Sequence, residues 1–316
     1  MIRPVEPADL ASWLGVVNEV RYWQDDLEAL SFDDTLRPAG EPILRLGAWT
    51  AEGALAGVAE AVLSEDGSRY ADRAVGLVGV PPPYRRQGLG TRLAEEVERF
   101  AVSTGNRWVE AEVRESSLAV ALPFVGRRGY VELERYRTSV QSPSTVDLSG
   151  LAALRSQLER EGIEIVAFPA IDSPSARDEL YRATLPIWRD MPHEPHVDWE
   201  DPQPDTFMRS IFERPSVLLE GFFVARAGER IVGLSYLARR PDGDAEVGDT
   251  GVLRDYRRRG IARALKLMVT SYAAQQGIKR VHTDNRADNA GMLAINRELG
   301  FVSGEQIVIF EKTLSQ

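Results

Sequence analysis

The chain has 316 residues, about two domains' worth, and each half is long enough to bury a core of its own. It has no cysteine, which excludes disulfides, thiolate metal sites and a cysteine nucleophile, and no apolar run is long enough to span a bilayer. The formal net charge of −10 disfavours a nucleic-acid or anionic-membrane partner. The N-terminus has no signal-peptide core, so we expect a soluble, cytoplasmic protein.

Apolar periodicity predicts an alternation of helices and strands along the first half. The predicted helices cover residues 9–30, 87–104 and a short segment that ends near Gly126. The predicted strands cover residues 42–49, 54–64, 75–80, 107–113 and 130–140. Residues 141–150 are polar and turn-prone, which predicts a junction between a domain at 1–142 and another at 151–316.

The second half repeats this order after a bridging helix at 151–161. Its predicted helices cover residues 174–189, 259–276 and 288–299. Its predicted strands cover residues 163–169, 245–252, 280–285 and 304–313, with a hairpin at 220–239. The same succession of elements in both halves indicates a duplicated domain.

One basic, glycine-containing segment occurs in both halves. Val80-Pro-Pro-Pro-Tyr-Arg-Arg-Gln-Gly-Leu-Gly-Thr91 returns as Val252-Leu-Arg-Asp-Tyr-Arg-Arg-Arg-Gly-Ile-Ala-Arg263. Each copy follows an apolar strand and opens an amphipathic helix. Small residues let a backbone approach its ligand closely, and free amides at the positive end of a helix attract anions. The repeat therefore predicts two loops suited to a pyrophosphate.

These residues resemble the GNAT superfamily of acyl-coenzyme-A-dependent N-acetyltransferases in its tandem-domain form. The family signature, Arg/Gln-x-x-Gly-x-Gly/Ala at a strand-to-helix turn, stands here from Arg85 to Gly90 and from Arg257 to Ala262. The segment 283–301 also resembles the family's fifth strand and following helix, which close on Gly-Phe. Its counterpart at 117–130 keeps the ending but lacks the asparagine that contacts the cofactor arm.

The resemblance implies an α+β (mixed α/β) fold of two tandem domains, each a splayed mixed sheet flanked by helices. It implies acetyl-CoA as cosubstrate, whose pantetheine arm enters where strands 4 and 5 part. Backbone amides near Thr250–Val252 would bind the thioester oxygen, a contribution of about 3 kcal/mol. The residues expected to bind the coenzyme are Val78, Val80, Arg85, Arg86, Gln87, Gly88, Leu89, Gly90, Thr91, Thr250, Gly251, Val252, Arg257, Arg258, Arg259, Gly260, Ile261, Ala262, Arg263, Asn285 and Asn289.

An amine nucleophile must lose a proton, and family members often place a glutamate on strand 4 for this step. Glu246 lies on that strand, and alternation puts Glu246, Gly248 and Thr250 on one face. Asp249, expected on the opposite phase, is the alternative base. Glu246 can also be a solvated carboxylate in an acidic run.

The family's usual acid, a tyrosine on the helix after strand 5, is replaced here. Asn296 occupies that position in the second half and Val125 in the first, and neither can donate a proton. An amide hydrogen bond from Asn296 or protonation through water could serve instead, or Asn296 could only fix its helix. The position matching Glu246 in the first half is Ala74, so we expect chemistry in the second half.

The resemblance places the acceptor site between the first two helices of a domain. In the second half this region, 190–205, is rich in acids, and the first half has acids at 25–34. A negative rim would attract a small cationic amine, although a solvated loop has the same composition. His193 and His196, with Glu194 and Asp198, could bind a metal, but Pro195 disfavours the helix that would make them converge, so we expect none.

The leading hypothesis is an enzyme that transfers acetyl from acetyl-CoA to a primary amine by direct attack. The alternative is a non-catalytic acyl-CoA-binding or regulatory protein, since Asn296 replaces the acid. A nucleotide-phosphate protein of another fold is disfavoured because no Gly-Lys-Ser/Thr follows either loop. An aminoacyl-tRNA-dependent transferase is disfavoured by the acidic chain.

Overall fold

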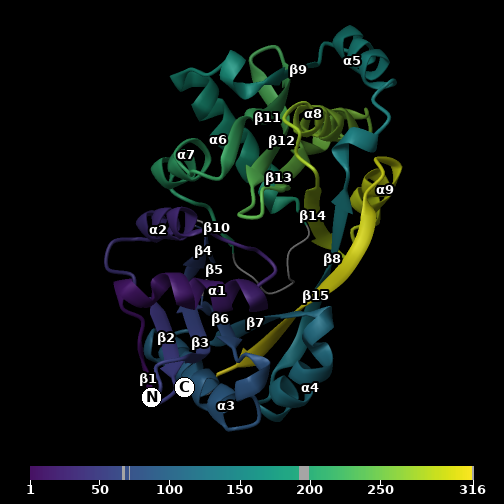
Figure 1. Ribbon diagram of the computed structural model, residues 1–316. Helices are drawn as coiled ribbons and strands as arrows, with labels where there is room; N and C mark the ends of the chain where they lie inside the picture. Colours follow the sequence, from purple (N-terminus) through teal and green to yellow (C-terminus); the bar gives the residue numbers. More distant parts are fainter. Residues whose placement is uncertain (66–67, 71, 192–198, 315–316) are drawn as a thin grey trace. The chain divides into compact units, whose positions relative to one another are not determined.

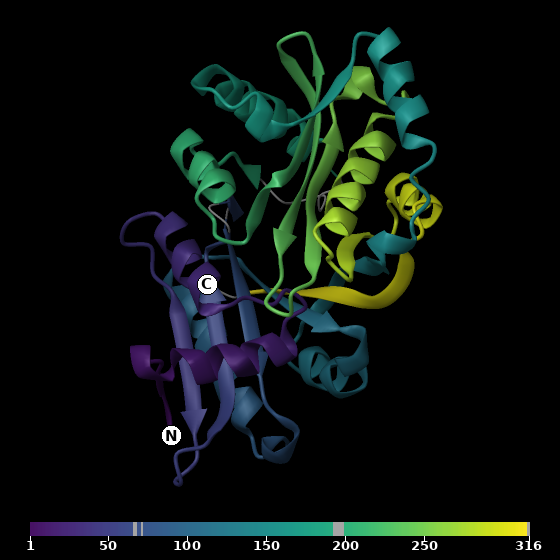
Figure 2. The same ribbon diagram turned by 45° about the horizontal axis from the view of Figure 1, so that its top comes forward.

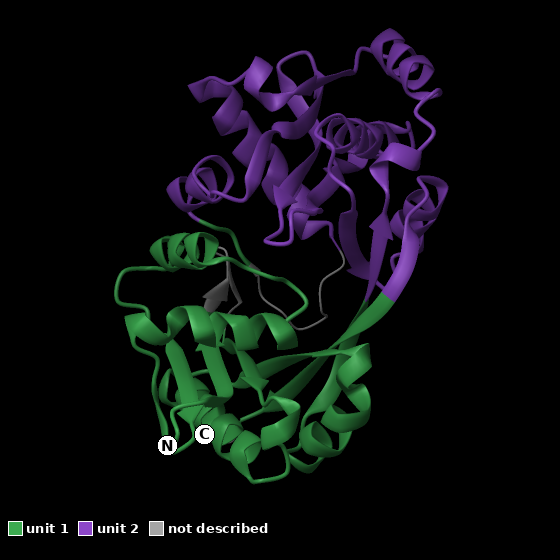
Figure 3. Ribbon diagram, viewed as in Figure 1, with its two compact units in different colours: residues 1–136, 194–202, 305–316 green, residues 137–193, 203–304 purple. Residues whose placement is uncertain are grey.

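The computed structural model describes residues 1–65, 68–70, 72–191 and 199–314, which form two compact units (Figure 3). Unit 1 is built from residues 1–136 with the described parts of 194–202 and 305–316. Unit 2 is built from residues 203–304 with the described parts of 137–193. Each unit is a mixed sheet with helices, so the predicted fold class is confirmed.

Among the described residues, the main sheet of unit 1 has the strand order β1-β2-β3-β6-β7-β15-β8 (Figure 1). They are β1 (Ile2–Pro4), β2 (Leu44–Trp49), β3 (Leu55–Val62), β6 (Arg73–Gly79), β7 (Trp108–Arg114), β15 (Val302–Thr313) and β8 (Val131–Gln141). Its helices are α1 (Leu10–Val20), α2 (Leu27–Leu36), α3 (Leu89–Ser103) and α4 (Leu118–Arg127). A small second sheet joins β4 (Ser64–Glu65), β5 (Ser68–Tyr70) and β10 (Trp199–Glu200).

The strands of unit 2 have the order β8-β14-β13-β12-β11-β9. Figure 2 shows them from a second direction. Besides the end of β8, its strands are β9 (Glu164–Ala167), β11 (Val217–Ala227), β12 (Arg230–Arg239), β13 (Ala245–Val252) and β14 (Val281–Arg286). Its helices are α5 (Leu151–Arg160), α6 (Pro174–Arg189), α7 (Pro204–Phe212), α8 (Ile261–Gln275) and α9 (Ala290–Glu298). The helix α7 has no counterpart in the sequence prediction.

The compact units are not contiguous in sequence, and the last strand is the largest exchange between them. The domain bounds 1–142 and 151–316 stay a prediction. β15 comes from the second repeat, but seven of its residues, Ile307–Thr313, pair antiparallel with Arg114–Trp108 of β7. Its side chains Val308 and Phe310 are buried with Val113 and Val125 of unit 1. The second repeat in sequence therefore supplies a strand of the first unit's sheet.

The single helix predicted for residues 9–30 is wrong, because the structure has two helices there. Asp26 caps α2, its Oδ1 accepting a hydrogen bond from the Ala29 amide at 2.8 Å. Asn18 and Asp25 exchange two side-chain-to-backbone bonds that fix the connection between the helices. Apolar spacing continues through this connection, so periodicity alone does not reveal the break.

Glycines let helices pack closely on both faces of the sheet of unit 2. A side chain at Gly251 of β13 would collide with Ile187 of α6. A side chain at Gly233 of β12, which pairs with Val252, would crowd Ile261 of α8. Neighbouring residues of a strand point to opposite faces, so α6 and α8 cover opposite faces of the sheet. Of the residues described, no helix is long and apolar enough to cross a membrane.

Candidate active site

The two glycine loops have the same backbone conformation. Gly88 and Gly260 stand just before α3 and α8 with φ of 78° and 86°, and Arg86 and Arg258 have φ of 64° and 65°. Residues with alternating left-handed φ turn successive amides toward one point, which makes a concave anion site beside the helix N-terminus. The predicted loops thus have the geometry that a pyrophosphate needs.

The first arginine of each loop holds the loop itself. Arg85 Nε donates to the Val80 carbonyl at 2.8 Å, and Arg257 Nε donates to the Val252 carbonyl at 2.9 Å. Arg257 also pairs with Asp190 at 2.9 Å. These two arginines therefore position the loops, while the exposed side chains of Arg86 and Arg258 are available to an anion.

The remaining loop residues divide into exposed polar side chains and backbone contributors. Gln87, Thr91, Arg259 and Arg263 are exposed. Ile261 is buried in the core, so only its backbone can face a ligand. The other predicted coenzyme residues lie at the ends of the strands (Val78, Val80, Thr250, Gly251 and Val252) and at or in the first helical turns (Leu89, Gly90 and Ala262).

The parallel strands that precede and follow each loop's helix stop pairing part-way along. β13 and β14 pair only at Ala245–Val281 and Glu246–His282. In unit 1, β6 and β7 pair at four positions and stop at Gly76–Ala111. Beyond these points the backbone groups that face the neighbouring strand have no partner in it. This parting of strands is the one that the resemblance implies.

A bulge in β13 changes which residues share a face. Leu237 pairs with Val247 but Ser235 pairs with Thr250, so β13 has one extra residue opposite Tyr236. Thr250 therefore lies on the face of Val247, and its hydroxyl lies 2.8 Å from that of Ser235. The prediction that Glu246 and Thr250 share a face is wrong, because simple alternation does not allow for the bulge.

Glu246 lies before the bulge, where β13 and β14 are still paired, and its carboxylate forms an ion pair with Arg240. Only 5% of its surface is exposed, and its Oε2 accepts from Arg240 Nη1 at 3.0 Å. A carboxylate held by a buried guanidinium in the closed part of the sheet has a ready structural role. Its assignment as base stays a prediction.

Asp249 lies at the bulge, beyond the last pair of β13 and β14. Trp188 of α6 donates its indole N–H to Asp249 Oδ2 at 2.8 Å. This contact puts Asp249 on the face of the sheet that α6 covers. The pairing register puts Glu246 on the same face. The prediction that the two carboxylates lie on opposite faces is therefore also wrong. Asp249 is half-buried, and it is the carboxylate of β13 that stands where the strands part.

Comparison with known proteins agrees with this geometry. The model of the acetyltransferase (GNAT) family matches the chain twice, at residues 9–130 and 181–301. The chain belongs to the GNAT family of acetyltransferases. A mycothiol acetyltransferase of Thermobifida fusca is 27% identical over 247 residues, which span 74% of this chain and 72% of that protein.

Two solved GNAT structures have a similar fold. A GCN5-related N-acetyltransferase of Sphaerobacter thermophilus aligns with a TM-score of 0.72 at 19% identity, covering 100% of this chain and 96% of that one. A tandem GNAT protein from the clavulanic acid biosynthesis pathway aligns with a TM-score of 0.71 at 16% identity, covering 100% and 99%. At these identities the similarity establishes the tandem GNAT fold alone.

The GNAT position that usually holds an acid is buried here. Asn296 of α9 is 2% exposed, and its Nδ2 donates to Asn285 Oδ1 of β14 at 2.7 Å. Its own Oδ1 has no hydrogen-bond partner among the described residues. Asn289 caps α9, its Oδ1 accepting from the Met292 amide at 3.1 Å, so its side chain has a local role.

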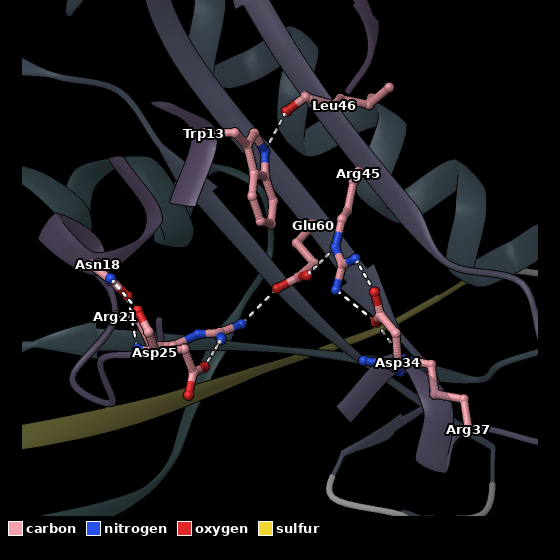
Figure 4. Close-up of polar contacts among 9 residues, drawn as sticks. All are labelled: Trp13, Asn18, Arg21, Asp25, Asp34, Arg37, Arg45, Leu46 and Glu60. Carbon is pink, nitrogen blue, oxygen red and sulfur yellow. Dashed lines mark hydrogen bonds and ion pairs between the residues drawn. The ribbon is translucent and has the colours of Figure 1, made fainter. Parts of the chain in front are cut away.

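Sequence reasoning missed two carboxylates in the first GNAT repeat. Glu60 of β3 is 3% exposed and bridges Arg21 at 2.5 Å and Arg45 at 2.9 Å (Figure 4). Glu112 of β7 accepts from the Tyr22 amide at 2.8 Å, and burial raises the pKa of its carboxyl. In β7, alternation of Val109, Ala111 and Val113 with acids is a signal for Glu112, whereas in β3 Glu60 shares its face with apolar residues and has no such signal.

These two carboxylates tie α1 and the connection after it to the sheet. Arg45 also pairs with Asp34 of α2 at 2.6 Å (Figure 4).

In unit 1, β3 and β6 pair without a register shift from Val58–Gly79 to Val62–Val75, so β6 has no bulge. The residue of β6 that corresponds to Glu246 is therefore Val75, one position from the predicted Ala74, and neither side chain is a base.

The histidines predicted as possible metal ligands, His193 and His196, lie outside the described residues, as do Glu194 and Asp198. His282 is described and lies in the segment of β14 that pairs with β13. Its Nε2 lies 3.0 Å from Asp244 Oδ2. Among the residues that the structure describes, no group of three or more side chains could hold a metal ion.

Proposed function

We propose that the protein transfers the acetyl group of acetyl-CoA to a primary amine of a small cationic acceptor, in unit 2. The observation that carries this proposal is Asp249, which stands at the bulge where β13 and β14 part. There a carboxylate can take the proton of an amine that attacks a thioester. Beyond Glu246, β13 no longer pairs with β14, so backbone amides on that side can bind the developing oxyanion.

The cationic class of the acceptor follows from the charges on the α6 face. Asp249 lies there, and alternation from His282 puts Asp284 of β14 there also. Trp188 and Tyr236 add aromatic surface, since the Tyr236 ring lies over Gly248 at the bulge. Acids beside aromatic rings attract an ammonium group. The relative named a mycothiol acetyltransferase supports acetyl transfer. The acceptor that we propose is a small cationic amine.

The proposal is tested by release of CoA thiol from acetyl-CoA in the presence of a panel of small amines. Thiol release that depends on a cationic amine supports it, with the acetylated amine identified by mass. Calorimetric binding of CoA with no release for any amine would favour a non-catalytic acyl-CoA-binding protein instead. Absence of both would remove the coenzyme from the function altogether.

Reversing the charge of Arg258 is expected to weaken CoA binding. Its guanidinium is exposed at the concave loop of unit 2, and a glutamate there would face the pyrophosphate. We expect Arg258→Glu to raise the calorimetric Kd for CoA at least tenfold, about 1.4 kcal/mol, with the melting temperature unchanged.

The matched variant Arg86→Glu tests the loop of unit 1 in the same way. A fall in binding stoichiometry from two to one would show that both loops hold coenzyme, and no change would leave unit 2 as the binding unit. An unchanged Kd in Arg258→Glu contradicts the assignment of that loop.

Removing Glu246 is expected to lower stability more than turnover. Arg240 is itself buried, at 7% exposure, and loses its close carboxylate in Glu246→Ala. Breaking such a pair costs about 3 kcal/mol, whereas kcat of the folded protein should stay within about threefold. Urea unfolding and thiol release measure the two quantities.

The control for Glu246 is Asp242→Ala, which removes a more exposed carboxylate 3.9 Å from Arg240. That change should cost less than about 1 kcal/mol. A kcat about a hundredfold lower in Glu246→Ala, at unchanged stability, would restore Glu246 as the base.

A further inference from the structure

Helix α8 buries a lysine in the core of unit 2. Lys266 is 1% exposed, between the buried Leu265 and Leu267. Its Nζ lies 5.2 Å from the centroid of the Phe301 ring, and among the described residues no carboxylate lies within ion-pair distance of it. A buried ammonium without a close counter-ion is unfavourable and calls for a function.

Helix and strand geometry place Lys266 level with the bulge. α8 starts beside the end of β13, because a side chain at Gly233, which pairs with Val252, would crowd Ile261. Lys266 lies five residues after Ile261, about 7.5 Å along the helix at about 1.5 Å per residue. A strand rises about 3.3 Å per residue, so about 7.5 Å corresponds to about two residues of β13. Counted back from Val252, that residue is Thr250. Thr250 lies on the face of the sheet that α8 covers. It pairs with Ser235, which shares that face with Gly233 of the same strand.

Two neighbours place Lys266 on the β14 side of that level. One is Phe301, whose amide bonds to the Asn296 carbonyl at the end of α9. The other is Asp284 of β14, whose charge acts on Lys266 from the α6 face. Since β14 and β13 no longer pair at Asp284, no backbone ladder separates the two side chains there. Lys266 thus lies near Asp284, a residue past the last pair of β13 and β14, whereas Asp249 lies on the α6 face.

The titration of Lys266 suits proton donation. Burial lowers the pKa of the Lys266 ammonium to about 8, while the charge of Asp284 acts to raise it. An acid with a pKa near the working pH transfers its proton most effectively. Asn296, in the position of the family's tyrosine, has no proton to give.

We propose that Lys266 stabilises and protonates the thiolate of CoA as the acetyl group leaves it. The inference rests on the proposed function. The acceptor nitrogen attacks the carbonyl carbon, and the C–S bond breaks with its electron pair on sulfur. Sulfur takes a proton from Lys266 Nζ, giving CoA thiol and a neutral amine. Asp249 takes the proton of the acceptor, and solvent returns a proton to Lys266.

The first test measures the thiol pKa of bound CoA from its thiolate ultraviolet absorbance. A free thiol of this kind has a pKa near about 8.5. In the wild-type complex we expect a pKa at least one unit lower, and in Lys266→Met the ordinary value. The Met variant should fold, since it replaces a buried charge by an apolar chain of similar length.

Desulfo-CoA is the matched ligand for this test. It should bind the wild type and Lys266→Met with equal Kd, because the proposed contact is with sulfur. Equal thiol pKa values in the two complexes would overturn the proposal. So would an equal loss of affinity for CoA and desulfo-CoA, because that result means that Lys266 only supports the fold.

The second test is turnover. Lys266→Met should lower kcat about tenfold without changing the KM for acetyl-CoA, and Asn296→Tyr added to it should restore part of the rate. A lowered thiol pKa in a wild-type protein that acetylates no amine would refute the proposed function and leave the lysine contact standing. Normal turnover in Lys266→Met would refute the role of the lysine alone.

Discussion

Asp249→Asn is expected to lower kcat by roughly 10²–10⁴, the range for loss of a general base. Asparagine has the same shape and keeps an oxygen that can accept the Trp188 N–H, so the bulge and the fold should be preserved. The KM for acetyl-CoA should not change, because the proposed coenzyme contacts are made by the loop and by backbone groups of β13, which this substitution leaves in place. Thiol release under saturating amine gives kcat, and the melting temperature reports the fold.

Asp284→Asn is the matched control for this variant. It removes the same charge from the same face of the sheet but from β14, on the other side of the opening. We expect a higher KM for a cationic acceptor and a loss of kcat of less than about tenfold, because the charge of Asp284 also acts on the proposed acid Lys266. If both variants lose kcat equally, the two acids act only through their negative charge and neither is the base. If Asp249→Asn turns over normally, the assignment of Asp249 is wrong.

The sequence predicted the elements whose signals are local. The two loops follow from glycine and arginine spacing, and the structure gives both the same left-handed residues at Arg86, Gly88, Arg258 and Gly260. The succession of strands and helices follows from apolar periodicity in each half. These features depend on neighbouring residues, so a duplicated segment shows them twice.

The candidate base could not be chosen from the sequence because the bulge is a property of strand pairing. Alternation counts residues along β13, but the extra residue opposite Tyr236 is visible only when β12 is placed beside it. Gly248, over which the Tyr236 ring lies, is the one local sign. The buried carboxylates Glu60 and Glu112 were missed for a related reason, since their partners lie far away along the chain.

The position of the last strand was also beyond sequence reasoning. β15 has the apolar alternation of a strand that would complete its own repeat. Only the contacts with β7 show that it completes the sheet of unit 1. This assignment makes a strong prediction about which part of the protein needs residues 305–316.

A chain that ends at Gly304 is expected to lose the fold of unit 1 and keep that of unit 2. The truncation removes a strand that lies between β7 and β8, with Ile307, Val308 and Phe310 buried. Each such side chain contributes about 1.5–3 kcal/mol, so with the seven-residue ladder the loss approaches the whole stability of a domain. Hydrogen exchange should show β6 and β7 unprotected and β12 and β13 protected.

Point variants separate the strand's packing from the loss of chain length. Phe310→Ala should destabilise unit 1 by about 3–5 kcal/mol, because its ring lies in the core formed by Val113 and Val125. Val302→Ala, at a residue of the same strand that is 68% exposed, should change stability by less than about 0.5 kcal/mol. If the truncated chain instead unfolds unit 2 and spares β7, the last strand belongs to its own repeat and the exchange between repeats does not occur.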